Sequence, residues 1–151
     1  MNRLERAVDE VDPGLSVRMR ALKMRLRHDI FPRLLQDMMG PAEVGVDVGA
    51  NRGVYAYLMS LRVGPQGHVH ALEPFPGNGE RLRTIARRRG NITVHMVAAS
   101  DRPGVGLLRI PVHDGRRIDW EAGDALVVEN ACVSSTGFAC VRFFGGTYQP
   151  R

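Results

Sequence analysis

A strand-like run that ends in a glycine-rich turn most limits how this chain can fold. Residues 43–49 read Glu-Val-Gly-Val-Asp-Val-Gly, and their valines predict a short buried strand. The small-residue turn 49–53 follows, and apolar residues at helical spacing over 54–63 predict a helix. A strand that passes through such a turn into a helix is typical of open α/β sheets, which bind ligands at the carboxyl ends of their strands.

The same alternation continues along the chain. Residues 68–72 predict a second strand, 76–89 an amphipathic helix and 92–98 a third strand. Strands that alternate with helices in this way pair in parallel through right-handed crossovers. The sequence therefore predicts a Rossmann-like α/β core over residues 41–112 with a parallel sheet.

The segments on either side of this core are less regular. Residues 1–40 form an N-terminal helical segment, with one helix predicted over 15–39 that Pro32 kinks or divides. We expect this helix to pack on one face of the sheet. Beyond the core, residues 105–112 predict an edge strand that tolerates a proline. Residues 113–151 predict only an irregular or short-strand segment, with apolar runs at 126–128, 138–141 and 143–144.

Composition sets the class of protein. The chain has 151 residues, of which 44% are hydrophobic and 25% charged, as expected for one globular domain with one core. Its first 14 residues hold no apolar run, which argues against a secretory signal and favours a cytoplasmic protein. Cys132 and Cys140 have no clustered histidines or further cysteines, so we predict no disulfide and no metal site.

Basic residues give the chain a net charge of +5 and gather in residues 1–40 and 81–89. Such a balance can serve nucleic acid, an acidic membrane surface or anionic substrates. No aromatic residues interleave with the arginines as they do in base-stacking surfaces, and no apolar stretch is long enough to span a membrane. We therefore expect solvated helix faces, with nucleic acid an unlikely partner and no membrane.

The carboxylate before the turn indicates which nucleotide cofactor fits. Gly45, Gly49 and Gly53 are spaced by four residues, whereas dinucleotide-binding turns read Gly-x-Gly-x-x-Gly. Asp47 would repel a pyrophosphate, but it suits the ammonium and sulfonium charges of S-adenosylmethionine. This difference favours a methyl donor over NAD.

Two further strand ends carry polar residues. Glu73 ends the second strand, where an acidic side chain can accept hydrogen bonds from both ribose hydroxyls. Ser100 and Asp101 end the third predicted strand, on what should be the same edge of the sheet, and could bind the adenine amine. Asp101 also begins a turn with Pro103 and Gly104, so turn formation explains it equally well.

Three segments together resemble the FkbM-type methyltransferases: Val46-Asp47-Val48-Gly49-Ala50-Asn51-Arg52-Gly53-Val54-Tyr55, Ala71-Leu72-Glu73-Pro74-Phe75-Pro76 and Val97-Ala98-Ala99-Ser100-Asp101-Arg102-Pro103-Gly104. The resemblance implies a class I methyltransferase fold, S-adenosylmethionine as cofactor, and O-methylation of a sugar or natural-product hydroxyl. It also implies that the methionine part is held by Asp47, Gly49, Ala50, Asn51 and Gly53, and the ribose by Glu73.

The chain departs from that family after the third strand. The family continues with a Lys-Ile-Asp-Val-Glu-Gly-type acidic motif and further strands. Residues 117–124 resemble this motif loosely, and a polar turn between edge strands is the alternative. Asp119 and Glu121 are the only candidate bases that the resemblance supports, and no histidine has a partner acid at a readable spacing, so the catalytic residue stays unknown.

Three hypotheses follow. The chain is a methyltransferase acting on a small-molecule hydroxyl, or a truncated and inactive methyltransferase-like domain, or a basic nucleic-acid-binding module. The truncated form would lack room for a full seven-stranded sheet and would expose an apolar sheet edge, through which it could form a homo-oligomer.

Overall fold

A computed structural model of the chain describes residues 3–100 and five strand segments, at 104–109, 112–113, 116–117, 127–129 and 138–145. Side chains are described for residues 4–99. The described part contains five helices and a parallel three-stranded sheet, which confirms the predicted α/β class.

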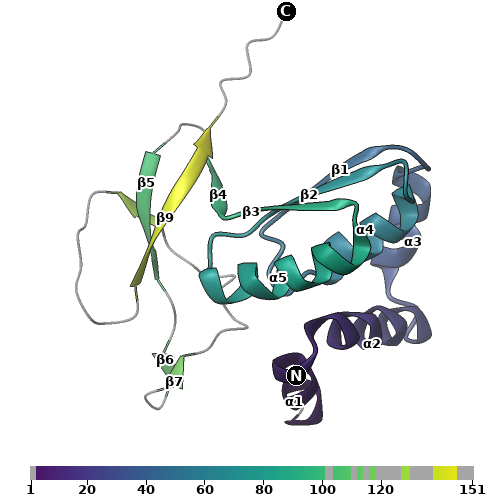
Figure 1. Ribbon diagram of the computed structural model, residues 1–151, viewed down its shortest axis with the longest axis horizontal. Coiled ribbons are helices and arrows are strands. Elements are labelled where there is room, and N and C mark those ends of the chain that lie inside the picture. Colours follow the sequence, from purple (N-terminus) through teal and green to yellow (C-terminus); the bar gives the residue numbers. More distant parts are fainter. Residues whose placement is uncertain are drawn as a thin grey trace, which may run out of the picture.

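The parallel sheet forms as the sequence predicts. Strands β1 (Val44–Val48), β2 (His68–Leu72) and β3 (Ile92–His95) lie in the order β1-β2-β3, and both pairs are parallel. Helices α4 (Val54–Val63) and α5 (Pro76–Arg89) connect them and lie on the same side of the sheet (Figure 1). The carboxyl ends of the strands therefore meet at one edge, next to the turn that enters α4.

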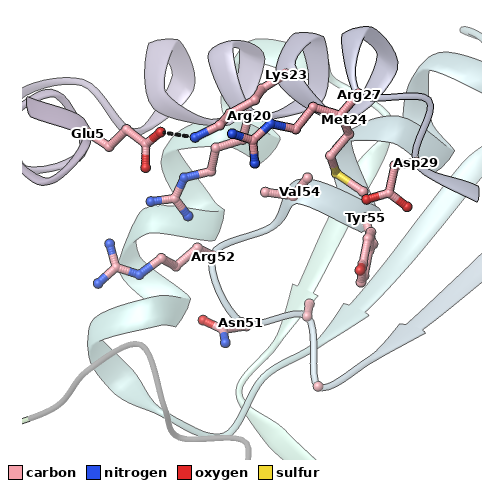
Figure 2. A pocket seen from close by; sticks show the side chains of 12 residues that line it. Glu5, Arg20, Lys23, Met24, Arg27, Asp29, Asn51, Arg52, Val54 and Tyr55 are labelled. Atoms are coloured by element: carbon pink, nitrogen blue, oxygen red, sulfur yellow. Dashed lines mark hydrogen bonds and ion pairs between the residues drawn. The ribbon is translucent and has the colours of Figure 1, made fainter. Parts of the chain in front are cut away.

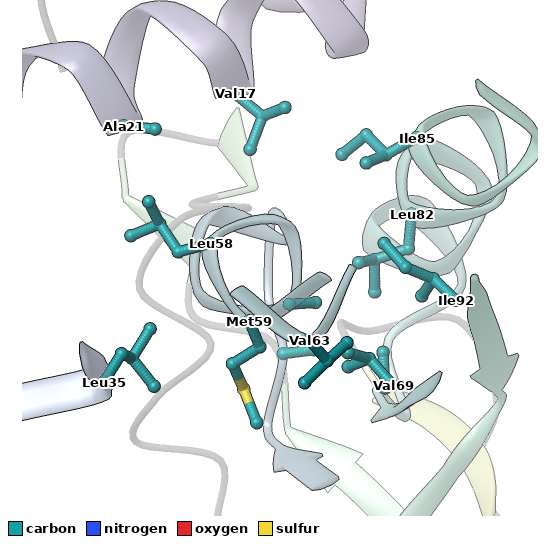
Figure 3. Close-up of a cluster of buried hydrophobic side chains, with 13 residues drawn as sticks. Val17, Ala21, Leu35, Leu58, Met59, Val63, Val69, Leu82, Ile85 and Ile92 are labelled. Atoms are coloured by element: carbon teal, nitrogen blue, oxygen red, sulfur yellow. The ribbon is translucent and has the colours of Figure 1, made fainter. Parts of the chain in front are cut away.

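The hydrophobic core lies between this sheet and its two helices (Figure 3). Val69 and Ala71 of β2 are completely buried, as are Leu82 of α5 and Ala56 of α4. The opposite face of β1 is different, since its three valines are 56–64% exposed: Val44, Val46 and Val48. Within the described residues, β1 is thus covered on one face only, while the corresponding residues of β2 are half-buried.

The N-terminal segment contains three helices, α1 (Arg3–Val11), α2 (Pro13–Leu26) and α3 (Ile30–Met38). The segment 15–39 is divided, which is one of the two predicted outcomes, but the break does not lie at Pro32. The break after α2 lies at His28, whose φ is +55°, a left-handed conformation that ends a helix. Pro32 does not cause this break, because it lies in the first turn of α3, where its missing N–H would have no intrahelical acceptor.

Two aspartates fix where these helices begin. The Asp12 carboxylate accepts the Leu15 N–H at 3.0 Å, and Pro13 follows as the first residue of α2. The Asp29 carboxylate accepts the Phe31 N–H at 3.2 Å in the same way for α3. Side chains that serve as helix caps, rather than the proline, therefore divide the segment.

The position of α2 also differs from the prediction. It packs across α4 and α5 rather than on the sheet, and it buries Val17 and Ala21 against them (Figures 1 and 3). The described layers therefore run from sheet to α4 and α5 to α2. This arrangement places α2 beside the turn that follows β1.

The third predicted strand, 92–98, is divided into β3 and β4 (Val97–Ser100). Met96 lies between them and places its thioether against Gly79 of α5. β4 leaves the first sheet and joins a second one, in the order β4-β9-β5-β8, with β5 (Gly104–Arg109), β8 (Val127–Glu129) and β9 (Phe138–Gly145).

The later segments agree only in part with their predictions. The predicted strand 105–112 is instead β5 followed by β6 (Val112–His113), which pairs with β7 (Arg116–Arg117). The apolar runs at 138–141 and 143–144 belong to one strand, β9, and that at 126–128 overlaps β8. Pro111, Cys132 and residues 118–124 lie outside the described residues.

Candidate functional site

The turn after β1 is held by bonds to the neighbouring strand. The N–H groups of Gly49 and Ala50 both donate to the Leu72 carbonyl, at 2.9 and 3.0 Å, and the Gly53 N–H donates to the Ala50 carbonyl at 2.8 Å. Gly49, Asn51 and Gly53 adopt positive φ angles of +73°, +49° and +81°. The N–H groups of Gly49, Ala50 and Gly53 are thus used within the protein, so a ligand here must be recognised largely by side chains and shape.

The two positive-φ glycines serve different purposes. A Cβ at Gly53 would lie 2.6 Å from Leu82 Cδ2 and 3.1 Å from Ile85 Cδ1, so this glycine lets α5 pack closely against the turn. A Cβ at Gly49 would meet nothing within 4 Å. Gly53 is therefore explained by packing, whereas Gly49 faces open space at the end of β1.

Asp47 lies on the helix-facing side of β1 and is 8% exposed. Its carboxylate accepts the Ala56 N–H, the bond that a capping side chain normally makes, because Gly53 at the N-cap of α4 has no side chain. The other oxygen, Oδ2, is buried without a hydrogen-bond partner among the described residues. Burial, with a smaller contribution from nearby Glu73, raises the pKa of Asp47 to about 6.

Glu73 is 4% exposed and holds the turn in place. Its Oε2 accepts the Asn51 N–H at 2.7 Å, and its Oε1 accepts the Phe75 N–H at 2.8 Å. Burial raises the pKa of Glu73, and these two bonds together with one from Asn78 oppose that rise. Both carboxylate oxygens are engaged, and with the bond from Asn78 the carboxylate retains capacity for about one further donor.

Asn78 completes this buried polar group and was not predicted from the sequence. Its side chain is fully buried, and its Nδ2 donates to Asn51 Oδ1 at 3.1 Å. Asn78 Oδ1 has no partner among the described residues. The only sequence signal was an asparagine just inside the predicted helix 76–89, a position that also suits an ordinary helix start.

A third buried carboxylate joins the N-terminal helices to the turn. Asp9 of α1 is 3% exposed and accepts a hydrogen bond from Arg52. Its Oδ2 also lies 3.1 Å from Arg81 Nε, and its Oδ1 3.8 Å from Arg20 Nη2. One carboxylate thus connects α1, α2, α5 and the turn. Some basic residues that were expected to be solvated are ion-pairing partners between helices, including Arg88 with Asp12.

A cavity of about 530 Å³ lies between α2 and the turn (Figure 2). Its floor is formed by residues 49–52 together with Val54 and Tyr55 at the start of α4. Its lining is completed by side chains of the N-terminal segment: Glu5, Arg20, Lys23, Met24, Arg27 and Asp29. Its volume lies within the range of about 300–1,000 Å³ that is usual for small-molecule sites.

The structure brings together most, but not all, of the predicted cofactor residues. Gly49, Ala50 and Asn51 line the cavity, while Asp47, Gly53 and Glu73 lie behind the turn and support it. Ser100 ends β4, which pairs with β9 rather than with β3. Asp101, Asp119 and Glu121 lie outside the described residues.

No family model matches the chain, and no curated protein matches its sequence at a significant level. None of the described helices is both long and apolar enough to cross a membrane. The described residues also hold no group of three or more metal-ligating side chains that could bind an ion.

Proposed function

We propose that the chain binds S-adenosylmethionine at the turn after β1 and acts in the cytoplasm as a methyltransferase on a small-molecule hydroxyl group. The observation that carries this proposal is the unpartnered Oδ2 of Asp47, a buried acceptor of raised pKa behind a glycine turn. A buried carboxylate without a counter-charge is costly for a fold to keep. A cationic ligand at this edge of the sheet would supply the missing charge.

The residues fit this cofactor in two respects. S-adenosylmethionine carries an ammonium and a sulfonium charge, and Asp47 and Glu73 place two carboxyl groups behind the turn. Gly49 leaves open space where a side chain would otherwise project, and a cavity large enough for a nucleoside adjoins it. Gly49, Ala50 and Asn51 would therefore contact the cofactor, with Asp47 compensating its charge.

Glu73 fits less directly. Its carboxylate already accepts two backbone N–H groups, so ribose hydroxyls would have to use its remaining acceptor capacity. Glu73 thus has a structural role whether or not it contacts the ribose. Its substitution would affect the turn as well as any ligand, which makes Asp47 the better residue for a test.

The chemistry that this cofactor supplies is an electrophilic methyl group. The contribution of the protein would be to orient the acceptor oxygen toward that methyl group and to exclude water. The wall of the cavity formed by Met24, Val54 and Tyr55 suits the second task. Tyr55 is held in place by Phe31, whose ring centroid lies 3.9 Å from that of Tyr55.

Calorimetric titration of the full chain with S-adenosylmethionine tests the proposal. We expect saturable binding that Asp47→Asn weakens at least tenfold, since the substitution removes the counter-charge and keeps the shape. Asp37→Asn, at an exposed position of α3, is the matched control and should bind as the unaltered chain does. Absence of binding by the unaltered chain, or equal binding by Asp47→Asn, would refute the proposal.

The valine row on β1 supports self-association as a second property. Val44, Val46 and Val48 form an open apolar row on β1 within the described residues. Sedimentation of the chain as a monomer at all concentrations would exclude it.

A further inference from the structure

We infer that the second ligand of the cavity, the methyl acceptor, carries an oxyanion group, a carboxylate or phosphate, bound by the cations on one face of α2. This inference rests on the proposed function only in naming the ligand a methyl acceptor. The anion site itself is supported by separate observations. These are the spacing of three cations along a helix, the wall that they form and the charge balance of the cavity.

Three cationic side chains, two of α2 and one at its C-cap, follow one another at helical spacing. Arg20, Lys23 and Arg27 are spaced by three and four residues, and such residues lie above one another on a helix. All three line the cavity and project from α2 over the turn (Figure 2). Like charges at these spacings destabilise a helix, so their alignment is unfavourable unless an anion lies between them.

Acidic side chains compensate the charge of these cations only in part. Glu5 pairs with Lys23 at 2.7 Å, and Asp29 uses its carboxylate to cap α3. The described residues provide no ion pair for the Arg27 guanidinium, which lies at the end of the row. The lining as a whole contains four cations and two acids: Arg20, Lys23, Arg27 and Arg52 against Glu5 and Asp29.

The ion cluster behind the wall does not remove this imbalance, because it adds one acid, Asp9, and one further cation, Arg81. Asp9 is shared by Arg20, Arg52 and Arg81. Arg20 and Arg52 belong both to this cluster and to the cavity lining, and the cluster fixes their position. A pre-positioned guanidinium beside a flexible lysine is well suited to an oxyanion, because little side-chain freedom is lost on binding.

Groups of opposite charge thus lie toward the two ends of the cavity, with the carboxyl groups outside its lining. The carboxyl groups of Asp47 and Glu73 lie behind the turn, where a sulfonium cofactor would be favoured. The row of cations lies on α2 across the cavity from the turn, where the cofactor's positive charge would be disfavoured. An anionic acceptor entering along α2 would therefore meet the cofactor between the two ends.

Calorimetric titration of the full chain with inorganic pyrophosphate and, separately, with citrate tests the inference at low salt. We expect saturable binding of at least one anion, and the tighter of the two indicates phosphate or carboxylate chemistry. Lys23→Ala and Arg27→Ala should each weaken it about tenfold, as expected for the loss of a charged hydrogen-bond donor. Arg25→Ala, on α2 but outside the cavity lining, should leave it unchanged.

The controls separate the possible failures. Absence of saturable binding by both anions, or equal weakening by Arg25→Ala, would overturn the inference. A fall in S-adenosylmethionine affinity in Arg27→Ala would also overturn it, since the cations would then hold the cofactor's own carboxylate. Anion binding without S-adenosylmethionine binding would leave the anion site intact and reject the methyltransferase proposal, and the reverse pattern would do the opposite.

Discussion

Asp9 and Asp47 are both buried carboxylates beside the same turn, yet their surroundings are opposite. Asp9 is 3% exposed and has three guanidinium groups around it. Asp47 is 8% exposed, and its nearest charged influence is another carboxyl group, Glu73. The first carboxylate stabilises the contact between α1 and the core. The second is unfavourable for the fold alone, which points to a role in binding.

The stability of the chain should respond in opposite ways when Asp9 and Asp47 are each replaced by the same residue. Replacing a compensated buried carboxylate leaves its cations unpaired, whereas replacing an uncompensated one removes a charge that burial disfavours. Neutral asparagine variants test this directly because they keep the size of the side chain.

Asp9→Asn should have the largest effect, a loss of about 3–5 kcal/mol in the free energy of unfolding, since it leaves three buried or half-buried arginines without their common counter-ion. Urea unfolding followed by circular dichroism measures it. If the variant does not fold, Arg81→Gln should show a smaller loss, because Asp9 keeps Arg52 and Arg20. If the urea midpoint of unfolding is unchanged in both Asp9→Asn and Arg81→Gln, Asp9 does not stabilise the fold, and the difference from Asp47 is lost.

Asp47→Asn should instead stabilise the chain at pH 7.5, by about 1–3 kcal/mol. The pKa of Asp47 rises from 3.8 to about 6 on folding, so the folded state binds the proton more tightly. The contribution of Asp47 to stability is therefore favourable below pH 4 and is lost as the pH rises through about 6.

The same unfolding measurement at two pH values checks that sign. The advantage of Asp47→Asn over the unaltered chain should be present at pH 7.5 and absent near pH 4. A destabilised variant at pH 7.5 would mean that the bond from Ala56 N–H to the carboxylate outweighs the burial of its charge.

Glu73→Gln should have the smallest effect, a destabilisation of about 1 kcal/mol. Glutamine has one acceptor oxygen, so it can accept the N–H of Asn51 or of Phe75 but not both. Relief of the buried charge offsets part of this loss. Thermal unfolding of the Glu73→Gln and Asp47→Asn variants, side by side, measures the difference in their stability. If Glu73→Gln stabilises the chain as much as Asp47→Asn does, the two bonds to Glu73 contribute little.

The sequence was sufficient for the central elements because their signals are local. The valines of β1, the turn 49–53 and the apolar spacing of α4 all lie within about 20 residues, and the predicted bounds of α4 and β2 agree with the structure. The parallel order of the three strands followed from their alternation with helices.

The N-terminal helices were less predictable because their ends depend on side-chain capping. Asp12 and Asp29 each begin a helix, but an aspartate amid arginines gives the same composition as a solvated helix face. The helix α1 was missed because its residues are mostly charged, and Asp9 is buried only through partners that are distant in sequence.

The site was predicted as a list of residues rather than as an arrangement. Asp47, Gly49 and Glu73 do lie around one turn, but the sequence could not indicate that Glu73 binds two backbone N–H groups or that Asp47 caps α4. The cationic wall depends on where α2 packs, and that position is set by buried side chains of α4 and α5.

The pH dependence of S-adenosylmethionine binding tests the central claim most directly. Calorimetry between pH 5 and 8 should show that the unaltered chain binds more tightly as the pH rises through about 6, because ionised Asp47 attracts the cationic cofactor. Asp47→Asn should bind weakly and without that rise. Both chains contain the same histidines, so histidine titration cannot cause a difference between them. A dissociation constant that is independent of pH, or equal in both chains, would contradict the account.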